Sequence, residues 1–456
     1  MSAPVLTTAT PTSHPPKPEF PASSSDSTPA TVPRQRQFSP EFQPKSAARP
    51  KLRRAAPYGP SPTPPTRRPA ARPRNRSRSP RRWPDLARSR RRQKARKGQE
   101  DRFCTQCHSI PGVRSGDVHP GFTFGALHEP TMDGVSCAVC HNATAVVRTH
   151  NAGLELEFRG PMHGNLADPK GATAHANAPG PVQQSAEFCA ACHDVNELHG
   201  LSLEKPFAEW QDSPAPGLQQ TCQTCHMPQY AGLAAVDGPQ LQGLHRHRFV
   251  GFDPPGAATG TTAELKAGFD ADLAQLLDHA AKVTAVVAVP GLGGVANLTV
   301  DVQNLILGHG LPTGTTFLRQ CWLNVEVRDA AGKLLYASGD LDANGDLRNR
   351  WSQLDPFGDP DLISLSSELI DAKGEPTLFP WLAAEHHRNA LRAGETKTFT
   401  YFVPLASDFH GALQVQVRLR MRAAPPFLLR LVGLDDLLPH NRTVDLAHDG
   451  TAVVIP

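Results

Sequence analysis

The sequence lacks several features that would place it quickly in a common class. No stretch of its 456 residues is long and apolar enough to span a bilayer. Met1 to Pro21 does not combine a basic start with an apolar run, so no secretion signal is visible. Of nine cysteines, only Cys321 falls outside four short repeats, so a disulfide framework is excluded. Because Cys321 lies in an apolar stretch, we expect it to be a buried thiol.

Common enzyme motifs are also missing. The glycine-rich segment 291–294 is not followed by a helical pattern, which a nucleotide-binding loop requires. No Ser/His/Asp spacing and no pair of carboxylates stands out. A nucleotide-binding or hydrolytic enzyme therefore has no specific support in the sequence.

What the sequence does contain is one pentapeptide in four copies. The Cys-x-x-Cys-His repeats consist of Cys104, Cys107 and His108; Cys137, Cys140 and His141; Cys189, Cys192 and His193; and Cys222, Cys225 and His226. This pattern is the attachment signal of c-type haem, in which the cysteines form two thioethers and the histidine is the proximal iron ligand. A zinc ribbon also uses Cys-x-x-Cys pairs, but zinc does not require histidine as the next residue. The repeats predict four haem c groups, with a zinc-binding module as an alternative.

The sixth ligand of each iron decides between electron transfer and catalysis. A second histidine fills the sixth coordination position of the iron, whereas an empty position lets small molecules bind. The histidines available near the motifs are His119, His128, His150, His163, His175, His199, His245 and His247. From their local context we predict His128, His163, His175 and His247 as distal ligands, with His119 or His199 as substitutes for His163.

Residues 1–98 differ in composition from the rest of the chain. They are rich in Pro, Ser and Arg and poor in aliphatic residues, so we expect them to be disordered. Between residues 34 and 97 there are many basic residues and only two acidic ones, Glu41 and Asp85. The net charge of +4 therefore averages a basic tail and an acidic remainder. Residues 76–82 resemble RNA-binding segments, but a solvated tail is the simpler interpretation and no specific nucleic acid is expected.

Three explanations of this tail stay open. It is a segment that is not the natural N-terminus, it belongs to an unrecognised export route, or it is a genuine cytoplasmic tail that would undermine the haem assignment. The first is preferred, because covalent haem attachment normally takes place outside the cytoplasm.

The remainder predicts a multidomain protein. Residues 99–256 are expected to form a tetrahaem cytochrome c domain, mostly α-helical or irregular, whose core is haem rather than side chains. Its expected helices are short, such as the turn that carries each Cys-x-x-Cys-His motif and residues 203–212. Residues 257–282 predict a connecting helix, because apolar residues recur there at helical spacing. Residues 283–456 predict an antiparallel β-sandwich-like domain with a long irregular insertion at 340–395. The expected strands are 283–289, 296–305, 321–328, 334–338, 396–403 and 412–421.

The motifs with their flanking residues resemble the bacterial multihaem cytochromes c. They are similar to the tetrahaem cytochromes c that accept electrons from hydroxylamine oxidoreductase. The resemblance covers residues 103–251 and rests on the patterns at 134–141, 187–194, 207–213 and 221–228. It extends more weakly to Gly-His-Gly-Leu-Pro-Thr-Gly at 308–314. It implies closely stacked haems, a periplasmic location and electron transfer, and the first hundred residues depart from it.

Histidines at two positions after residue 256 could also bind a metal. His309 in the segment 308–314 is either an inter-domain haem ligand or a structural turn residue, and the second interpretation is preferred. His386 and His387 could form a metal pair, but an exposed loop is the simpler explanation.

The leading functional hypothesis is a periplasmic multihaem cytochrome that passes electrons between redox partner proteins, with the β-domain as a docking or spacer module. It is more a carrier than a catalyst. The alternatives are a multihaem reductase, in which one five-coordinate haem acts on a small nitrogen or sulfur oxyanion, and a zinc- or nucleic-acid-binding module.

Overall fold

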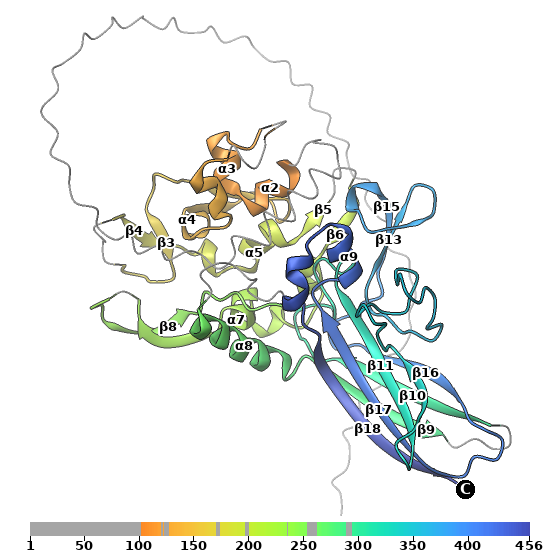
Figure 1. Ribbon diagram of the computed structural model, residues 1–456. Coiled ribbons are helices and arrows are strands. Elements are labelled where there is room, and N and C mark those ends of the chain that lie inside the picture. Colours follow the sequence, from red (N-terminus) through yellow and green to blue (C-terminus); the bar gives the residue numbers. More distant parts are fainter. Residues whose placement is uncertain are drawn as a thin grey trace, which may run out of the picture. The chain divides into compact units, whose positions relative to one another are not determined.

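The computed structural model describes residues 102–119, 122, 127–169, 174–196, 200–234, 236–252, 262–288 and 294–456 (Figure 1). All of them belong to one compact unit of the chain. The predicted disordered tail 1–98 and His199 lie outside the described residues. We call residues 102–252 the motif region and residues 281–456 the sandwich region.

Each Cys-x-x-Cys-His motif lies on a short helix that ends at the motif histidine. These helices are α2 (Arg102–His108), α4 (Cys137–His141), α5 (Ala186–His193) and α7 (Cys222–His226). The two cysteines of a motif share one helix face because residues three apart are neighbours on it. Capping helps to start two of them: the Ser185 hydroxyl accepts from the Phe188 amide, and Thr221 forms a capping box with Thr224. The predicted helical turns at the motifs are therefore confirmed.

The other elements of the motif region are equally short. They are helices α3 (Ile110–Ser115), η2 (Glu129–Asp133), η3 (Val182–Gln184), α6 (Pro206–Gln211) and η4 (Pro216–Leu218). Three antiparallel strand pairs join β1 (Ala143–Val146) to β2 (Leu154–Leu156), β5 (Val195–Asn196) to β6 (Ser202–Glu204) and β7 (Gln229–Leu233) to β8 (Gln240–His245). The pair β3 (Met162–Gly164) and β4 (Asn177–Pro179) is parallel. The sequence predicts a helix over 203–212, but its first residues form β6.

Apolar packing differs strongly between the two regions. In the described part of the motif region, buried apolar residues form clusters such as Val118 with Phe122, Ala143 with Leu154 and Ala191, and Ala186 with Ala190 and Phe207. The sandwich region contains one large cluster to which both of its main sheets contribute. Each large buried aliphatic side chain contributes about 1.5–3 kcal/mol, so a cluster of two or three residues stabilises the fold much less than the large cluster of the sandwich region does.

Helix α8 (Ala263–Leu277) connects the two regions. The Thr262 hydroxyl caps it by accepting from the Leu265 amide, and its Phe269 and Leu273 are buried with Val250. The sequence predicts a helix to 282, but α8 ends at Leu277 because strand β9 begins at Ala281.

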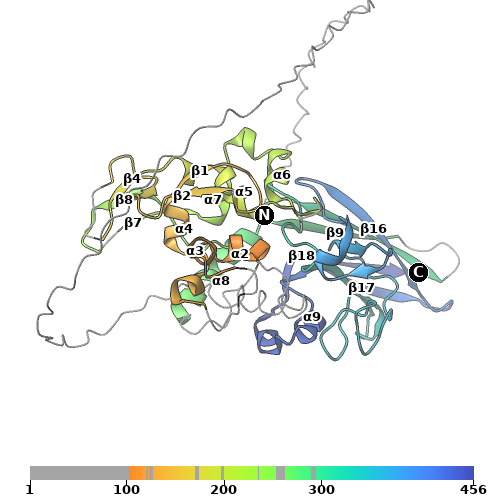
Figure 2. The same ribbon diagram turned by 90° about the horizontal axis from the view of Figure 1, so that it is seen from above.

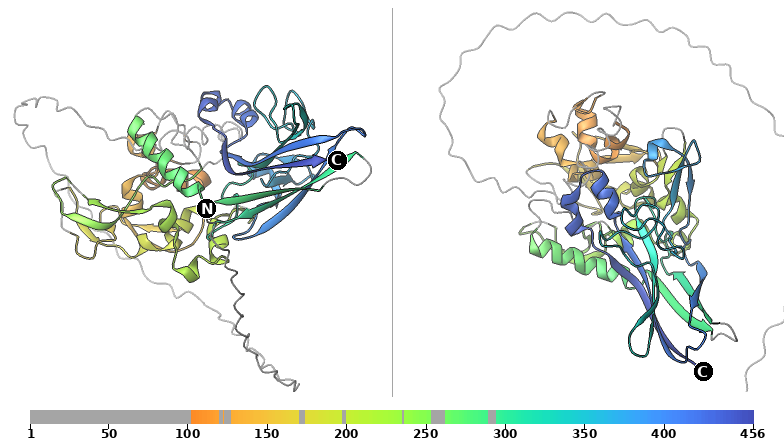
Figure 3. Two further views of the ribbon diagram at one scale, coloured as in Figure 1. Left: turned by 90° about the horizontal axis from the view of Figure 1, so that it is seen from below. Right: turned by 45° about the vertical axis from the view of Figure 1, so that its right-hand side comes forward.

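The sandwich region consists of two antiparallel sheets that share one core, and they can be followed in Figure 2 and from two further sides in Figure 3. One has the order β16-β10-β9, with β9 (Ala281–Ala288), β10 (Val295–Asn304) and β16 (Thr396–Pro404). The other has the order β12-β11-β17-β18, with β11 (Gln320–Asp329), β12 (Leu334–Ser338), β17 (Gly411–Arg422) and β18 (Val444–Ile455). The six predicted strands are present, and Cys321 on β11 is fully buried as expected.

The long insertion is more regular than the sequence predicts. Residues 368–387 form a three-stranded sheet of β13 (Glu368–Asp371), β14 (Pro376–Thr377) and β15 (Ala383–His387), with η5 (Pro380–Leu382) before β15. The prediction of an irregular 340–395 is therefore wrong for this part. After β17 come α9 (Pro426–Leu431) and η6 (Asp435–His440).

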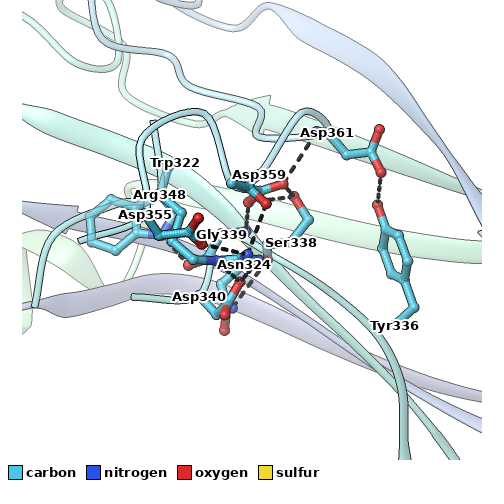
Figure 4. A network of polar contacts seen from close by, with 11 residues as sticks. Trp322, Asn324, Tyr336, Ser338, Gly339, Asp340, Arg348, Asp355, Asp359 and Asp361 are labelled. Carbon is cyan, nitrogen blue, oxygen red and sulfur yellow. Dashed lines mark hydrogen bonds and ion pairs between the residues drawn. The ribbon is translucent and has the colours of Figure 1, made fainter. Parts of the chain in front are cut away.

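A buried carboxylate ties the first half of the insertion to β12 (Figure 4). Asp359 accepts hydrogen bonds from the Ser338 hydroxyl at 3.1 Å and from the Gly339 amide at 2.6 Å. Arg348 holds the same loop together through Asp340 at 2.7 Å and the Gly358 carbonyl at 2.8 Å. Since Asp359 is 7% exposed, its partners have little water available as a substitute.

We predict that Asp359→Ala lowers the free energy of unfolding by about 2–4 kcal/mol, because it leaves buried donors unpaired. Asp361→Asn is the matched control, since Asp361 is exposed and accepts only from the Tyr336 hydroxyl among side chains. It should cost less than about 1 kcal/mol. Urea unfolding followed by circular dichroism measures both, and equal losses would contradict the role given to Asp359.

Candidate haem-binding site

The four motif helices meet around α5. The thiols of Cys107 and Cys192 are hydrogen-bonded to each other, and so are those of Cys189 and Cys222. These partner thiols, together with burial, raise the pKa of Cys107 and of Cys189. Cys140 of the second motif also lies close enough to raise the pKa of Cys189. The third motif therefore adjoins the other three.

Two glutamine side chains join the second and fourth motifs. Gln183 on η3 donates from Nε2 to the Cys140 carbonyl at 3.1 Å and to the Ala143 carbonyl at 2.8 Å. Gln223, which lies inside the fourth motif, donates to the Gln183 carbonyl at 2.9 Å and to the Ser185 carbonyl at 2.8 Å. Because Gln223 is 6% exposed, these bonds are largely shielded from water.

The second motif histidine faces a predicted distal ligand. The rings of His141 and His247 have centroids 6.0 Å apart and planes 29° apart. His141 donates from Nδ1 to the His163 carbonyl at 2.5 Å. His247 packs edge-on against Phe249 at 5.8 Å between ring centroids. Of the four predicted distal ligands, His247 is thus brought to a motif histidine.

The fourth motif histidine faces a residue from the sandwich region. The rings of His226 and His309 have centroids 6.2 Å apart and planes 22° apart. His226 donates from Nδ1 to the Val250 carbonyl at 2.5 Å, and His309 from Nδ1 to the Gly310 carbonyl at 2.9 Å. Burial lowers the pKa of His309 to about 4, so its ring is neutral at neutral pH.

The separation of the ring centres in both pairs is compatible with one metal ion between two imidazoles. With about 2 Å for each metal–nitrogen bond and about 1 Å from nitrogen to ring centre, ring centres on opposite sides of one iron lie roughly 6 Å apart. A carbonyl can only accept, so the Nδ1 atoms of His141, His226 and His309 carry the proton. Their Nε2 atoms then keep the lone pair that binds a metal, which is the tautomer that ligating histidines normally adopt.

The segment that carries His309 is anchored in the sandwich core. Asn304, at the end of β10 and fully buried, donates from Nδ2 to the carbonyls of His309 at 3.0 Å and Leu391 at 3.2 Å. Leu311 and Leu391 exchange backbone hydrogen bonds of 2.8 and 3.0 Å. His309 therefore has a fixed position. Its Nδ1 bond to the Gly310 carbonyl lies within its own turn, as the preferred interpretation expects, and a role as haem ligand stays a prediction.

The other predicted distal histidines have different surroundings. His128 is largely exposed and bonds through Nδ1 to Asp117 at 2.9 Å. His163 bonds through Nδ1 to the Pro179 carbonyl at 3.1 Å, and the exposed His175 bonds to the Ala176 carbonyl at 3.3 Å. The motif histidines His108 and His193 are exposed. The distal partners of His108 and His193 stay predictions.

A second polar contact between the two regions was not expected from the sequence. His386 lies on β15 and not in an exposed loop; it bonds through Nδ1 to the Ser202 carbonyl at 2.9 Å and through Nε2 to the Ser367 hydroxyl at 2.7 Å. Arg388 donates to the same Ser202 carbonyl at 2.8 Å. Burial, opposed by the Ser202 bond and helped by nearby positive charges, lowers the pKa of His386 to about 4.

Within the described ranges, no helix has the length and apolar character needed to cross a membrane. The same residues include no group of three or more His, Cys, Asp or Glu side chains that could hold a metal ion.

Comparison with known proteins rests on structure alone, since no family model and no curated protein matches the sequence. A penta-heme cytochrome c552 from Thermochromatium tepidum superposes with a TM-score of 0.52 and 19% sequence identity. The match covers 77% of this chain and 83% of that one. The fold is similar to that of a penta-heme cytochrome. Neither the motif region nor the sandwich region alone amounts to such a share, so the similarity spans both.

A second structure, the CARDB domain of a Pyrococcus furiosus protein in complex with di-metal ions, has a TM-score of 0.15 and 13% identity. That match covers 38% of this chain and 85% of the domain.

We predict that acid weakens the fold partly through His386. Its pKa is about 4 in the folded protein and about 6.5 in the unfolded chain, so the unfolded chain binds the proton first. The contribution of neutral His386 to the free energy of unfolding is complete above pH 6.5 and is lost as the pH falls towards 4. His386→Gln should flatten this part of the pH profile of the free energy of unfolding. His440, which is exposed on η6 and is not among the groups that shift the pKa of His386, supplies the control. His440→Gln should not flatten this part of the profile.

Proposed function

We propose that the protein binds haem c at its four Cys-x-x-Cys-His motifs and transfers electrons. The observation that carries this proposal is that two motif histidines each lie about 6 Å, between ring centres, from a second histidine. Each of these motif histidines donates from Nδ1 to a backbone carbonyl. The similarity to the fold of a penta-heme cytochrome supports it. So does the modest apolar packing of the motif region, which a large apolar porphyrin would supplement.

The chain's own residues divide into three roles. The eight motif cysteines would hold the porphyrin, and the four motif histidines would bind its iron. His247 and His309 would complete the ligand sets of the second and fourth motifs, while the carbonyls of His163, Val250 and Gly310 accept from the rings and fix their orientation. When bound, haem supplies an iron that accepts and releases single electrons.

Closed ligand sets favour electron transfer over catalysis. An iron held by two histidines has no position for a substrate, so it exchanges electrons with its neighbours instead. For the first and third motifs we propose His128, His163 or His175 as distal ligands. A reductase acting on a small oxyanion stays as the alternative, and it requires one of those two irons to lack a sixth protein ligand.

Location and partners follow from the same chemistry. Covalent haem attachment places the protein outside the cytoplasm, in the periplasm or an equivalent compartment. Its partners are then redox proteins that dock near the motif region, where Cys137 and Cys225 are exposed.

The decisive experiment uses protein matured in a host with a cytochrome c assembly system. Pyridine haemochrome absorbance should give four haems per chain, and electron paramagnetic resonance should show low-spin ferric iron. A colourless protein, or zinc in stoichiometric amount, would overturn the proposal. If all haems but one are low-spin and that one binds nitric oxide, the reductase function would be favoured instead.

A ligand substitution tests the pairing of His226 with His309. His309→Ala should leave the haem content unchanged and allow the reduced protein to bind one more equivalent of carbon monoxide than the wild type, because one iron loses its sixth ligand. His279→Ala is the matched control, since His279 is exposed and pairs only weakly with Asp278 at 3.4 Å. Unaltered carbon monoxide binding by His309→Ala would refute the pairing.

A further inference from the structure

One carboxylate links the motif region to the segment that carries His309. Glu209 lies on α6, between the third and fourth motifs, and its Oε2 atom accepts two hydrogen bonds from residues 308–314. The donors are the Gly310 amide at 3.1 Å and the Thr313 hydroxyl at 2.5 Å. Burial raises the pKa of Glu209, and these two bonds together with the charge of Arg388 oppose the rise.

The fit between α6 and this segment is close. A Cβ atom at Gly310 would lie 3.1 Å from the Leu391 carbonyl oxygen and 3.3 Å from Glu209 Oε2, so a side chain there would crowd the carboxylate. A Cβ at Gly308 would be in ordinary contact with Trp210 of α6 at 3.7 Å. Gly310 thus allows the segment to approach α6, whereas the space at Gly308 would accept a Cβ atom.

Helix α6 is itself fixed to both neighbouring motifs. Asp194, the residue after His193, accepts from the Phe207 amide at 2.8 Å and from the Ala208 amide at 3.3 Å at the start of α6. Trp210 donates from Nε1 to the Gln220 carbonyl at 2.8 Å, close to the start of the fourth motif. Glu209 is therefore held at a defined place relative to the third and fourth motifs.

We propose that Glu209 is a positioning residue, which holds the 308–314 segment against α6 so that His309 reaches the iron of the fourth motif. This inference rests on the proposed function. Asn304 and Leu391 attach the segment to the sandwich region, and Glu209 attaches it to the motif region. The sixth ligand of the fourth iron thus depends on a hydrogen-bonded contact between two parts of the chain.

The test compares two variants of the haem-loaded protein. Glu209→Ala removes both hydrogen bonds, whereas Glu209→Gln keeps an oxygen that can accept both and removes only the charge. Reduced Glu209→Ala should bind up to one more equivalent of carbon monoxide per chain than the wild type and show high-spin ferric iron after oxidation. Glu209→Gln should match the wild type. Glu155→Ala, which removes an exposed carboxylate on β2, should also match it.

The outcomes separate this inference from the proposed function. If His309→Ala binds extra carbon monoxide but Glu209→Ala with full haem content does not, the positioning role is wrong and the ligand pairing stands. If Glu209→Gln opens the iron as Glu209→Ala does, charge and not position is responsible, and the inference is again overturned. Should Glu209→Ala fail to mature, Thr313→Val removes one of the two bonds. It should raise carbon monoxide binding by a fraction of an equivalent, and no rise would count against the proposal.

Discussion

The motif region depends on hydrogen bonds that join its Cys-x-x-Cys-His turns to one another. Its described apolar clusters are small, so side-chain packing alone does not determine how the turns lie. Gln183 and Gln223 reach the backbone of neighbouring turns, and cysteines of the third motif lie beside those of the first and the fourth. Such bonds are directional, so they specify position more than they stabilise. That property suits a region in which the spacing of cofactor sites matters more than the size of a core.

The sandwich region fixes the position of the segment that carries His309. Its core anchors Asn304, and Asn304 holds the segment that carries His309. A ligand presented from a rigid sheet has a more defined position than one on a long loop, because little of its surroundings can move. Contacts of Glu209 and His386 with residues across the boundary then hold the two regions together.

Local patterns made much of the fold predictable. The motif spacing predicts helical turns, and the alternation in β17 predicts a strand, because both depend on residues close in sequence. Strand β18 was missed, since Asp445, His448, Asp449 and Gly450 interrupt its apolar pattern. The candidate site is harder to predict from the sequence, because a distal ligand is recognised by which motif histidine lies beside it in the folded chain. Context near the motifs favoured His247 but could not select His309, whose partner His226 lies in a different region.

The spatial order of the attachment cysteines differs from their order in the chain. Cys192 and Cys189 of the third motif touch Cys107 of the first and Cys222 of the fourth. The first motif therefore adjoins the third across a long stretch of sequence, and α5 stands at the centre of the group. Asp194, directly after α5, accepts from the start of α6, and α6 carries Glu209, which binds the 308–314 segment. A displacement of α5 or α6 would consequently alter the spacing to three motifs and the position of His309 together.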